Sequence, residues 1–362
     1  MSADVLAVRL DSDGDVLLTG PALRAVAHGA AAGGGRLDLL ASPAGAAAAR
    51  LLPGVRDVLT LDAPWSGYRP PLVDPGALLG LVDVVSARRY AAAVVFTSFH
   101  QSPLPTALLL RLAGVGEVSA TSEDYPGSLL DVRHRRPDGL HEVAAALDLA
   151  AAAGFPAPPD DDGRLRLRDD LPGVGSPVRG GGLPGEPYVV VHPGASVPAR
   201  APRPEHAAAI VAALTARGHR VVVTGGARET ALAAFVAGHR ATDLSGRTDL
   251  AGLAAVLAGA RCVVVGNTGP AHLAAAVGTP VVSLFSPVVP ADRWAPWGVP
   301  SVVLGDQDTP CRGTRARECP LPDHPCLSSV APGSVADAVD RLTTGTAGTA
   351  GAHGGPSRAV VA

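Results

Sequence analysis

Residues 262–285 alternate between apolar and turn-forming stretches in a way that predicts a strand, a tight turn, a helix and a second strand. The first four residues are apolar and largely β-branched, which is typical of a strand buried on both faces. Thr268 suits the N-cap of the helix, Pro270 its first turn, and Gly278 a left-handed C-terminal end. The helix would then begin at the carboxyl end of a parallel strand. Its free N–H groups and its dipole favour an anion there, phosphate above all.

The composition indicates a globular chain of two domains. The chain has 362 residues, of which 47% are hydrophobic and 17% charged, so it is long enough for two hydrophobic cores. A formal net charge of -3 gives no indication of a nucleic-acid partner. The sequence contains no lysine, which excludes a Schiff-base lysine, pyridoxal-phosphate chemistry and the P-loop lysine.

The sequence predicts a cytoplasmic protein without a transmembrane segment. Residues 1–9 lack the basic and apolar regions of a secretory signal. Asp148, Arg217 and Arg261 interrupt the alanine-rich stretches before these reach a membrane-spanning length. In that compartment the 4 cysteines are expected to be reduced.

The first half of the chain is predicted to be α/β. A strand at residues 5–9, a polar turn at residues 10–15 with Gly14 at its tip, and a helix at residues 16–28 form the first unit of a doubly wound domain. Further strands are expected at residues 36–41, 57–61 and 91–98, and further helices at residues 103–113 and 140–153.

The second half alternates more clearly between strands and helices. Strands are predicted at residues 188–192, 220–224, 242–244, 262–265 and 280–285, and helices at residues 204–217, 228–237, 249–260, 270–277 and 334–342. Between the halves, residues 156–186 are rich in proline, glycine and acidic residues. The predicted organisation is a first domain at residues 1–172, a linker at 173–186, a second domain at 187–342 and a disordered tail at 343–362.

Three polar turns of the second half follow predicted strands, at residues 192–196, 224–226 and 267–270. The carboxyl ends of parallel strands line one crevice, where glycines let the backbone approach a ligand and Ser196, Thr268 and Arg200 could bind phosphate. Any α/β domain also needs glycine turns at these places, so spacing alone leaves both interpretations open. No G-x-G-x-x-G follows a strand and no G-x-S-x-G is present, which disfavours a dinucleotide fold and a hydrolase elbow.

Five sequence motifs, taken together and in order, resemble glycosyltransferase family 9, the heptosyltransferase-like enzymes of bacterial envelope glycan synthesis. They are Arg9-Leu-Asp-Ser-Asp-Gly-Asp-Val-Leu-Leu-Thr19 with Pro21-Ala-Leu, His192-Pro-Gly-Ala-Ser196, Val223-Thr-Gly-Gly226, Ser245-Gly-Arg-Thr248 and Asn267-Thr-Gly-Pro-Ala-His272. The resemblance implies a GT-B fold, in which two Rossmann-like doubly wound domains face a cleft. The first domain would bind mainly the acceptor and the second the nucleotide-sugar, usually without a metal.

The resemblance also assigns the general base. The family's Gly-Asp pair falls on Gly14 and Asp15, so Asp15 would accept the proton of the acceptor hydroxyl. Asp11 and Asp13 lie beside it, and the residues alone do not choose among the three carboxylates. A helix-capping role for Asp15 is the structural alternative and is compatible with catalysis. Asp13 and His100, which follows the strand at residues 91–98, are assigned to the acceptor side.

The same resemblance places the donor site in the second domain. One position departs from the family, which commonly has Asn-Asp-Thr-Gly-Pro where this chain has Gly266-Asn267-Thr-Gly-Pro270, so an amide stands where a carboxylate would face the donor sugar. The residues expected to bind the donor are Ser196, Arg200, Gly225, Arg247, Asn267, Thr268, Gly269 and His272.

A cysteine-rich loop near the end of the second domain has two interpretations. Its Cys and His residues could form a Cys₃His zinc site, but the spacing lacks the usual C-x-x-C pair, so reduced thiols in a structural loop are preferred. The residues are Cys311, Cys319, His324 and Cys326.

The predicted function is inverting transfer of a heptose-like sugar from a nucleotide diphosphate donor to a cell-envelope glycan or a lipid-linked acceptor. No cofactor and no nucleic-acid partner are expected, and peripheral association with the inner face of the membrane is left open. Two alternatives remain: a nucleotide-sugar 2-epimerase of the same fold, and a catalytically silent sugar-nucleotide-binding relative.

Overall fold

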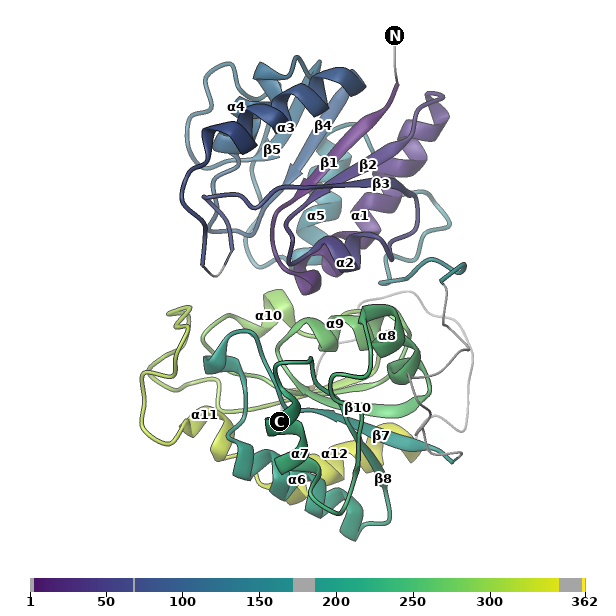
Figure 1. Cartoon of the computed structure of the whole chain (residues 1–362), viewed down its shortest axis with the longest axis vertical. Helices are drawn as coiled ribbons and strands as arrows, with labels where there is room; N and C mark the ends of the chain where they lie inside the picture. The colour runs from purple at the N-terminus through teal and green to yellow at the C-terminus, as the bar shows by residue number, and fades with distance from the viewer. Residues whose placement is uncertain (1–2, 68, 172–185, 345–359, 362) are drawn as a thin grey trace. The chain divides into compact units, whose positions relative to one another are not determined.

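The structure is a computed structural model that describes residues 3–67, 69–171, 186–344 and 360–361. The chain divides into two compact units, Met1–Asp169 and Asp170–Ala362, and each unit contains one parallel sheet with packed helices (Figure 1). The predicted linker at residues 173–186 lies outside the described residues except for Glu186, and so do residues 345–359 and 362 of the predicted tail.

The first unit is built on six parallel strands in the order β3-β2-β1-β4-β5-β6. Strand β1 lies between β2 and β4, and all five of its residues are buried, as expected for a strand covered on both faces. The strand order changes direction at β1 and β4, the kind of place where open α/β sheets bind ligands. The strands are β1 (Val5–Arg9), β2 (Leu37–Ala41), β3 (Val55–Thr60), β4 (Ala92–Phe96), β5 (Glu117–Thr121) and β6 (Val132–His134).

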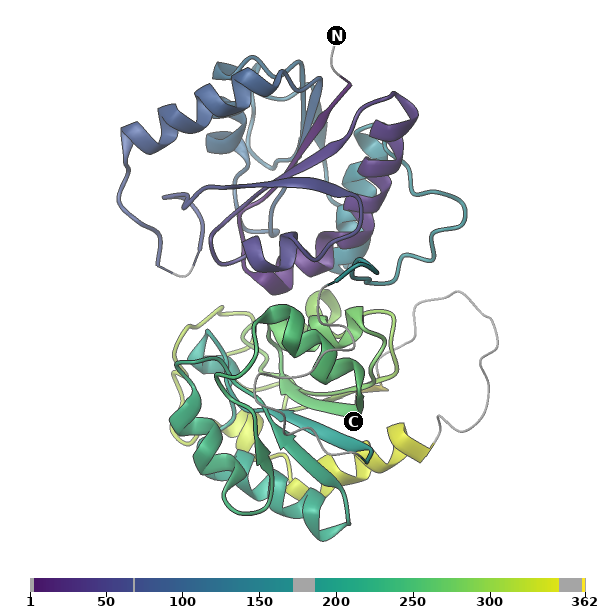
Figure 2. The same cartoon turned by 45° about the vertical axis from the view of Figure 1, so that its right-hand side comes forward.

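Helices cover both faces of this sheet. α1 packs against α5, and α3 packs against α4 (Figures 1 and 2). Leu6 and Val8 of β1 share a hydrophobic core with Val85 of α3 and Leu110 of α4. The helices are α1 (Asp13–Ala32), α2 (Ala46–Ala49), α3 (Pro75–Arg88), α4 (Leu104–Leu112) and α5 (Glu142–Ala152).

The start of α1 differs from the sequence prediction. The helix begins at Asp13, so Gly14 lies inside its first turn and not at the tip of a polar turn. Ser12 occupies the N-cap position with extended backbone. The acidic residues Asp13 and Asp15 stand in the first turn, where the helix dipole favours negative charge.

The second unit is built on seven parallel strands in the order β13-β12-β11-β10-β7-β8-β9. Val190 of β7 and Val264 of β10 are fully buried, which agrees with the doubly wound α/β architecture predicted from the sequence. The strands are β7 (Tyr188–His192), β8 (Arg220–Val223), β9 (Thr242–Asp243), β10 (Ala260–Gly266), β11 (Val281–Leu284), β12 (Ser301–Leu304) and β13 (Val360–Val361).

The helices of the second unit largely follow the predicted segments, and the last one is longer at both ends than predicted. β13 falls within the stretch predicted as a tail and pairs with β12. The helices are the 3₁₀ helix η1 (Pro198–Arg200), α6 (Pro204–Ala216), α7 (Thr230–Ala237), α8 (Leu250–Ala258), α9 (Gly269–Ala276), α10 (Ala291–Trp294), α11 (Pro325–Ser328) and α12 (Pro332–Thr344).

The strand, turn, helix and strand predicted at residues 262–285 are confirmed as β10, α9 and β11. β10 and β11 pair in parallel with Val263 opposite Val281. Thr268 is the N-cap residue of α9, but its side chain makes no capping hydrogen bond. Gly278 follows the helix with a φ of 80°, the left-handed conformation expected of a glycine at that position.

Candidate functional site

Asp15 lies near the carboxyl end of β1, in the first turn of α1. Its Oδ2 accepts a hydrogen bond of 3.0 Å from the Ser12 hydroxyl, and its Oδ1 lies 3.4 Å from Nη2 of Arg9. The side chain is 22% exposed, so an external hydroxyl can reach the carboxylate. Ser12, and not Asp15, is the N-cap residue, which corrects the capping interpretation of Asp15.

Arg9 is a buried cation that is surrounded by the carboxylates of Asp11, Asp15 and Glu142. The sequence analysis did not identify it as a site residue. Its Nη2 donates a hydrogen bond of 3.0 Å to Ser98, and its Nε lies 2.9 Å from Asp11. Glu142, another buried residue that sequence reasoning missed, lies 3.9 Å from Arg9. Burial lowers the pKa of Arg9, but the carboxylates around it outweigh burial and the pKa rises above its ordinary value.

Asp11 is a buried carboxyl of this cluster with a raised pKa. Burial raises its pKa to about 6, while the charge of Arg9 acts to lower the pKa and the charge of Asp15 to raise it. Gln101 donates a hydrogen bond of 2.6 Å from Nε2 to Oδ1 of Asp11. The Oε1 atom of Gln101 accepts from the Ser98 amide at 3.0 Å, so Gln101 links the loop after β4 to the loop after β1.

The two residues expected on the acceptor side stand at the start of α1 and in the loop after β4. Asp13 accepts a hydrogen bond of 2.9 Å from the Ala48 amide and so ties the start of α1 to α2. His100 is exposed, and its ring lies edge-on to Phe99 with 5.3 Å between the ring centroids. The residue after it, Gln101, lies against Asp11.

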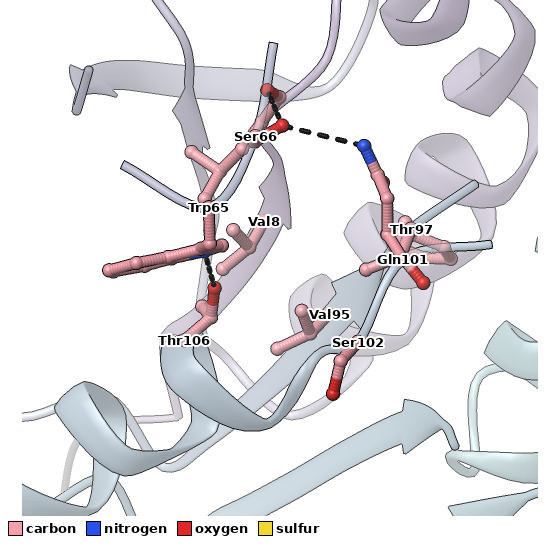
Figure 3. A pocket seen from close by; sticks show the side chains of 10 residues that line it. Val8, Trp65, Ser66, Val95, Thr97, Gln101, Ser102 and Thr106 are labelled. Carbon is pink, nitrogen blue, oxygen red and sulfur yellow. Dashed lines mark hydrogen bonds between the residues drawn. The ribbon is translucent and has the colours of Figure 1, made fainter. Parts of the chain in front are cut away.

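A pocket opens beside the Gln101 side chain at the carboxyl ends of β1 and β4 (Figure 3). Trp65 forms one wall and donates a hydrogen bond of 3.1 Å from its indole nitrogen to the Thr106 hydroxyl. The Gln101 amide nitrogen also lies 3.5 Å from the Ser66 hydroxyl, which itself donates to the Leu10 carbonyl. The lining residues are Val8, Leu10, Trp65, Ser66, Val95, Phe96, Thr97, Gln101, Ser102 and Thr106.

In the second unit, the three predicted polar turns do follow neighbouring strands. β7 lies between β10 and β8, so the turns at residues 192–196, 224–226 and 267–270 share one edge of the sheet. Ser196 is exposed at this edge, and Gly225 is buried in the second turn.

Arg200 ends η1 and packs with its backbone against the end of β10. A Cβ atom at Gly266 would lie only 2.5 Å from the Arg200 carbonyl oxygen, so only glycine lets these two backbones approach so closely. The Arg200 side chain is partly exposed, and it belongs to the same edge as Ser196 and the start of α9.

The residues at the start of α9 are largely buried. Asn267 accepts a hydrogen bond from the Ser286 amide at 3.2 Å and donates one to the Ser286 carbonyl at 3.4 Å. His272 is 4% exposed and lies in the first turn of α9, three residues after Gly269. The Thr268 hydroxyl oxygen is buried and has no hydrogen-bond partner among the described residues. Such an atom indicates a place where a ligand could supply the partner.

Glu229 is a further residue of this edge that the sequence analysis missed. Its Oε2 accepts a hydrogen bond of 2.7 Å from the Gly226 amide and lies 3.9 Å from Nε2 of His192. The carboxylate packs directly on Gly194, where any Cβ atom would collide with it. His192 is held by a 2.9 Å hydrogen bond to the Thr224 hydroxyl, and burial lowers the pKa of its imidazole while the Glu229 charge acts to raise it.

Arg247 lies in the turn that follows β9. The preceding Gly246 has a φ of 69° and donates a backbone hydrogen bond of 2.9 Å to the Gly225 carbonyl. This bond places the Ser245-Gly246-Arg247 turn beside the turn after β8, as the shared sheet edge predicts.

The cysteine-rich loop is held by contacts of its individual side chains. Cys311 lies 3.3 Å from the Thr309 hydroxyl, Cys319 contacts the Leu321 carbonyl, and Cys326 contacts the Ser286 hydroxyl. Within the part of the chain that the structure describes, no three His, Cys, Asp or Glu side chains are grouped to hold a metal ion. The geometry therefore does not support the zinc interpretation of Cys311, Cys319, His324 and Cys326.

Two Rossmann-like parallel-sheet units with these polar sheet edges define the GT-B class of α/β proteins, as predicted. Residues 98–324, more than half of the chain, match the model of glycosyltransferase family 9 (heptosyltransferase). The chain therefore belongs to glycosyltransferase family 9, a family of sugar-transferring enzymes. None of the described helices is both long and apolar enough to cross a membrane.

Individual relatives support the same family. The chain is 32% identical over 202 residues to lipopolysaccharide heptosyltransferase 3 of Escherichia coli, a match that covers 52% of this chain and only 55% of that protein. In fold it is similar to E. coli ADP-heptose LPS heptosyltransferase II, with a TM-score of 0.72, 20% identity and coverage of 95% and 99% of the two chains. It is also similar to E. coli heptosyltransferase WaaC with ADP-2-deoxy-2-fluoro heptose, with a TM-score of 0.67, 22% identity and coverage of 95% and 100%.

Proposed function

We propose that this chain is an inverting glycosyltransferase that moves a heptose-like sugar from a nucleotide diphosphate to a cell-envelope glycan or a lipid-linked acceptor. One observation carries the proposal: polar turns after three neighbouring strands meet the N-terminus of α9, beside Arg200 and the unpartnered Thr268 hydroxyl. Backbone N–H groups, a guanidinium and a hydroxyl are the groups that bind a diphosphate.

The donor is proposed to be an ADP-sugar bound by the second unit. The similar WaaC structure contains an ADP-heptose analogue, which supports adenine and heptose as the first choice. Its diphosphate would contact Ser196, Arg200, the Thr268 hydroxyl and the amide of Gly269 at the start of α9, with Gly225 letting the backbone approach. Arg247, Asn267 and His272 complete the proposed donor site.

Asp15 is proposed as the general base of the first unit. The acceptor oxygen forms a bond to the anomeric carbon while the bond from that carbon to the diphosphate oxygen breaks, and the hydroxyl proton passes to Asp15. Attack from the face opposite the leaving group inverts the anomeric carbon. Arg9, 3.4 Å from the carboxylate, favours its ionised form, and the Ser12 hydroxyl orients it.

The reaction is proposed to need no metal. The diphosphate that leaves carries the developing negative charge, and Arg200 together with the start of α9 can stabilise that charge directly. On the acceptor side, the pocket between Trp65 and Gln101 would hold part of the acceptor next to Asp11 (Figure 3).

Peripheral membrane association is proposed on the exposed apolar residues of the first unit. α3 and α4 contact each other, and both present leucines to solvent, as does the segment before α3. If these side chains gather on one face, that face would be typical of a membrane or protein interaction site. The side chains are Leu72, Val73, Leu79, Leu108 and Leu112. Replacing Leu72 and Leu79 by Asp should abolish co-sedimentation with anionic lipid vesicles, and unchanged sedimentation would contradict this proposal.

Sugar transfer itself tests the main proposal. The full chain is incubated with ADP-heptose and with other nucleotide sugars, with and without a lipid A-type glycan acceptor, and the products are identified by mass spectrometry. Transfer or slow donor hydrolysis supports a glycosyltransferase, and an epimerised donor would reveal an epimerase. Binding without turnover would support a catalytically silent relative, the second candidate function, which the amide at Asn267 favours.

A further inference from the structure

The cysteine-rich loop contacts η1, the short 3₁₀ helix that ends at Arg200. Ala199, the residue just before Arg200, is fully buried. Its amide donates a hydrogen bond of 3.0 Å to the Arg317 carbonyl, and its carbonyl lies 3.2 Å from Nε2 of His324. Its methyl group packs against Cys311 and Val288. The N–H and the C=O of Ala199 are therefore both hydrogen-bonded to the cysteine-rich loop, and its methyl group is packed as well.

The hydrogen bond to His324 has a defined direction. A carbonyl oxygen only accepts, so Nε2 of His324 must carry the proton and donate it to Ala199. Burial lowers the pKa of His324, while this hydrogen bond acts to raise it and the charge of Arg203 to lower it. His324 is only 8% exposed, so water has little access to replace the bond if the side chain is removed.

The loop adopts a strained conformation where it reaches the segment. Asp323 and His324 have φ values of 59° and 54°, in the left-handed region that non-glycine residues rarely adopt. Backbone strain of this kind persists only where the surroundings enforce it. A second tether is solvent-exposed: Asp323 pairs with Arg203 at 2.8 Å, just beyond Arg200.

On the side away from the loop, the Arg200 carbonyl lies in close contact with Gly266 at the end of β10. The segment is thus fixed between the strand edge and the loop, and this fixes the place from which the Arg200 side chain extends. We infer that His324 is a positioning residue for the donor diphosphate, acting through Ala199 to hold Arg200 in its binding conformation. This inference rests on the proposed donor site in the second unit.

Calorimetric titration of the full chain with ADP tests the inference. The His324→Asn variant tolerates the left-handed backbone, but its shorter amide cannot reach the Ala199 carbonyl. It should weaken ADP affinity by about five- to a hundredfold, the usual range of coupling between two sites. His324→Gln, whose amide nitrogen lies as far from the backbone as Nε2, should restore most of the affinity. Asp323→Asn, which removes the charge from only the exposed tether, should change it less than about threefold.

A double-mutant cycle separates positioning from a general loss of structure. In an Arg200→Ala background the His324→Asn change should alter ADP affinity by less than about twofold, because the side chain that His324 positions is gone. The full effect of His324→Asn in that background would overturn the inference. So would unchanged ADP affinity of His324→Asn in the otherwise wild-type chain.

Hydrogen–deuterium exchange provides a readout that does not depend on ADP. His324→Asn should speed exchange in a peptide that contains Ala199 and Arg200 and leave α6 unchanged. Equal exchange in both proteins would overturn the inference. A wild-type chain that fails to bind ADP while exchange responds as expected would instead reject the proposed donor site, together with the role of Arg200 on which the inference depends.

Discussion

The side-chain amide of Asn267 makes two hydrogen bonds with the backbone of Ser286, accepting from its N–H and donating to its C=O. This pair ties the end of β10 to the end of β11, and Asn267 is 4% exposed. A carboxylate has no hydrogen to donate when ionised, so it could make only the first of the two bonds. The amide that departs from the family pattern is therefore matched to its surroundings in this chain.

Replacing Asn267 by Asp should destabilise the protein near neutral pH. An ionised carboxylate would leave the Ser286 carbonyl without its donor and place a buried charge beside it. The free energy of unfolding should fall by about 1–3 kcal/mol, the cost of an unsatisfied buried polar group. Because a protonated Asp can donate again, the deficit should shrink as the pH falls toward about 4. Urea denaturation across pH measures both effects, and equal stability of the two proteins at pH 7 would contradict them.

Arg200→Ala should weaken ADP binding without unfolding the chain. Removing a charged hydrogen-bond donor from a phosphate should cost about 1.5–3 kcal/mol of binding free energy, measured by calorimetry. Arg220→Ala is the matched control, because Arg220 is an exposed arginine at the opposite end of β8, where it pairs with Glu186. Equal affinities of wild type and Arg200→Ala would remove Arg200 from the donor site.

The raised pKa of Asp11 predicts a particular dependence of stability on pH. The folded-state pKa is about 6, above the ordinary value of about 3.9. Between these values the folded chain keeps a proton that the unfolded chain has lost, so the free energy of unfolding falls as pH rises through this window. Asp11→Asn lacks this titration. Relative to that variant, wild type should lose stability between about pH 4 and 6 and then level off. A difference in unfolding free energy that stays constant over this range would contradict the prediction.

Local signals made much of the fold predictable. The β10–α9–β11 unit combines an apolar run, an N-cap threonine, an early proline and a terminal glycine, and each acts over a few residues. α3 was missed because Val85 is its only buried residue, so apolar and polar positions do not alternate with a helical period. β12 was missed because its short apolar run lies between loops without a neighbouring helix signal.

The site was less predictable because its contacts join distant parts of the chain. Asp15 belongs to a motif that can be read along the sequence, and Arg200 closely follows the motif that ends at Ser196. Arg9, by contrast, meets Ser98 and Glu142 only after β1, β4 and α5 pack together. Glu229 lies three residues beyond Gly226, and only the fold places its carboxylate over Gly194. A buried arginine at a strand end is a signal that could have drawn attention to Arg9, but its partners could not be read from the sequence.

Turnover should persist in the presence of a chelator. The proposed donor site neutralises the leaving diphosphate with Arg200 and the start of α9, so EDTA should leave the rate of sugar transfer unchanged. The rate is measured after dialysis against the chelator, with magnesium added back in a parallel sample. A loss of activity that magnesium restores would show that the diphosphate needs a cation as well.

Asp15→Asn should abolish most of the turnover while leaving the protein folded. The amide oxygen can still accept from the Ser12 hydroxyl, and Arg9 keeps Asp11 and Glu142 as neighbours, so stability and ADP affinity should be close to those of wild type. An amide cannot take the acceptor proton, which should lower the rate by about 10²–10⁴-fold. Asp13→Asn is the control, because the new amide oxygen can still accept the hydrogen bond from the Ala48 amide. Asp13 is not proposed to take a proton in the reaction, so its replacement should leave turnover nearly unchanged. Rates measured with ADP-heptose and an acceptor would contradict the assignment if Asp13→Asn were inactive and Asp15→Asn retained normal turnover.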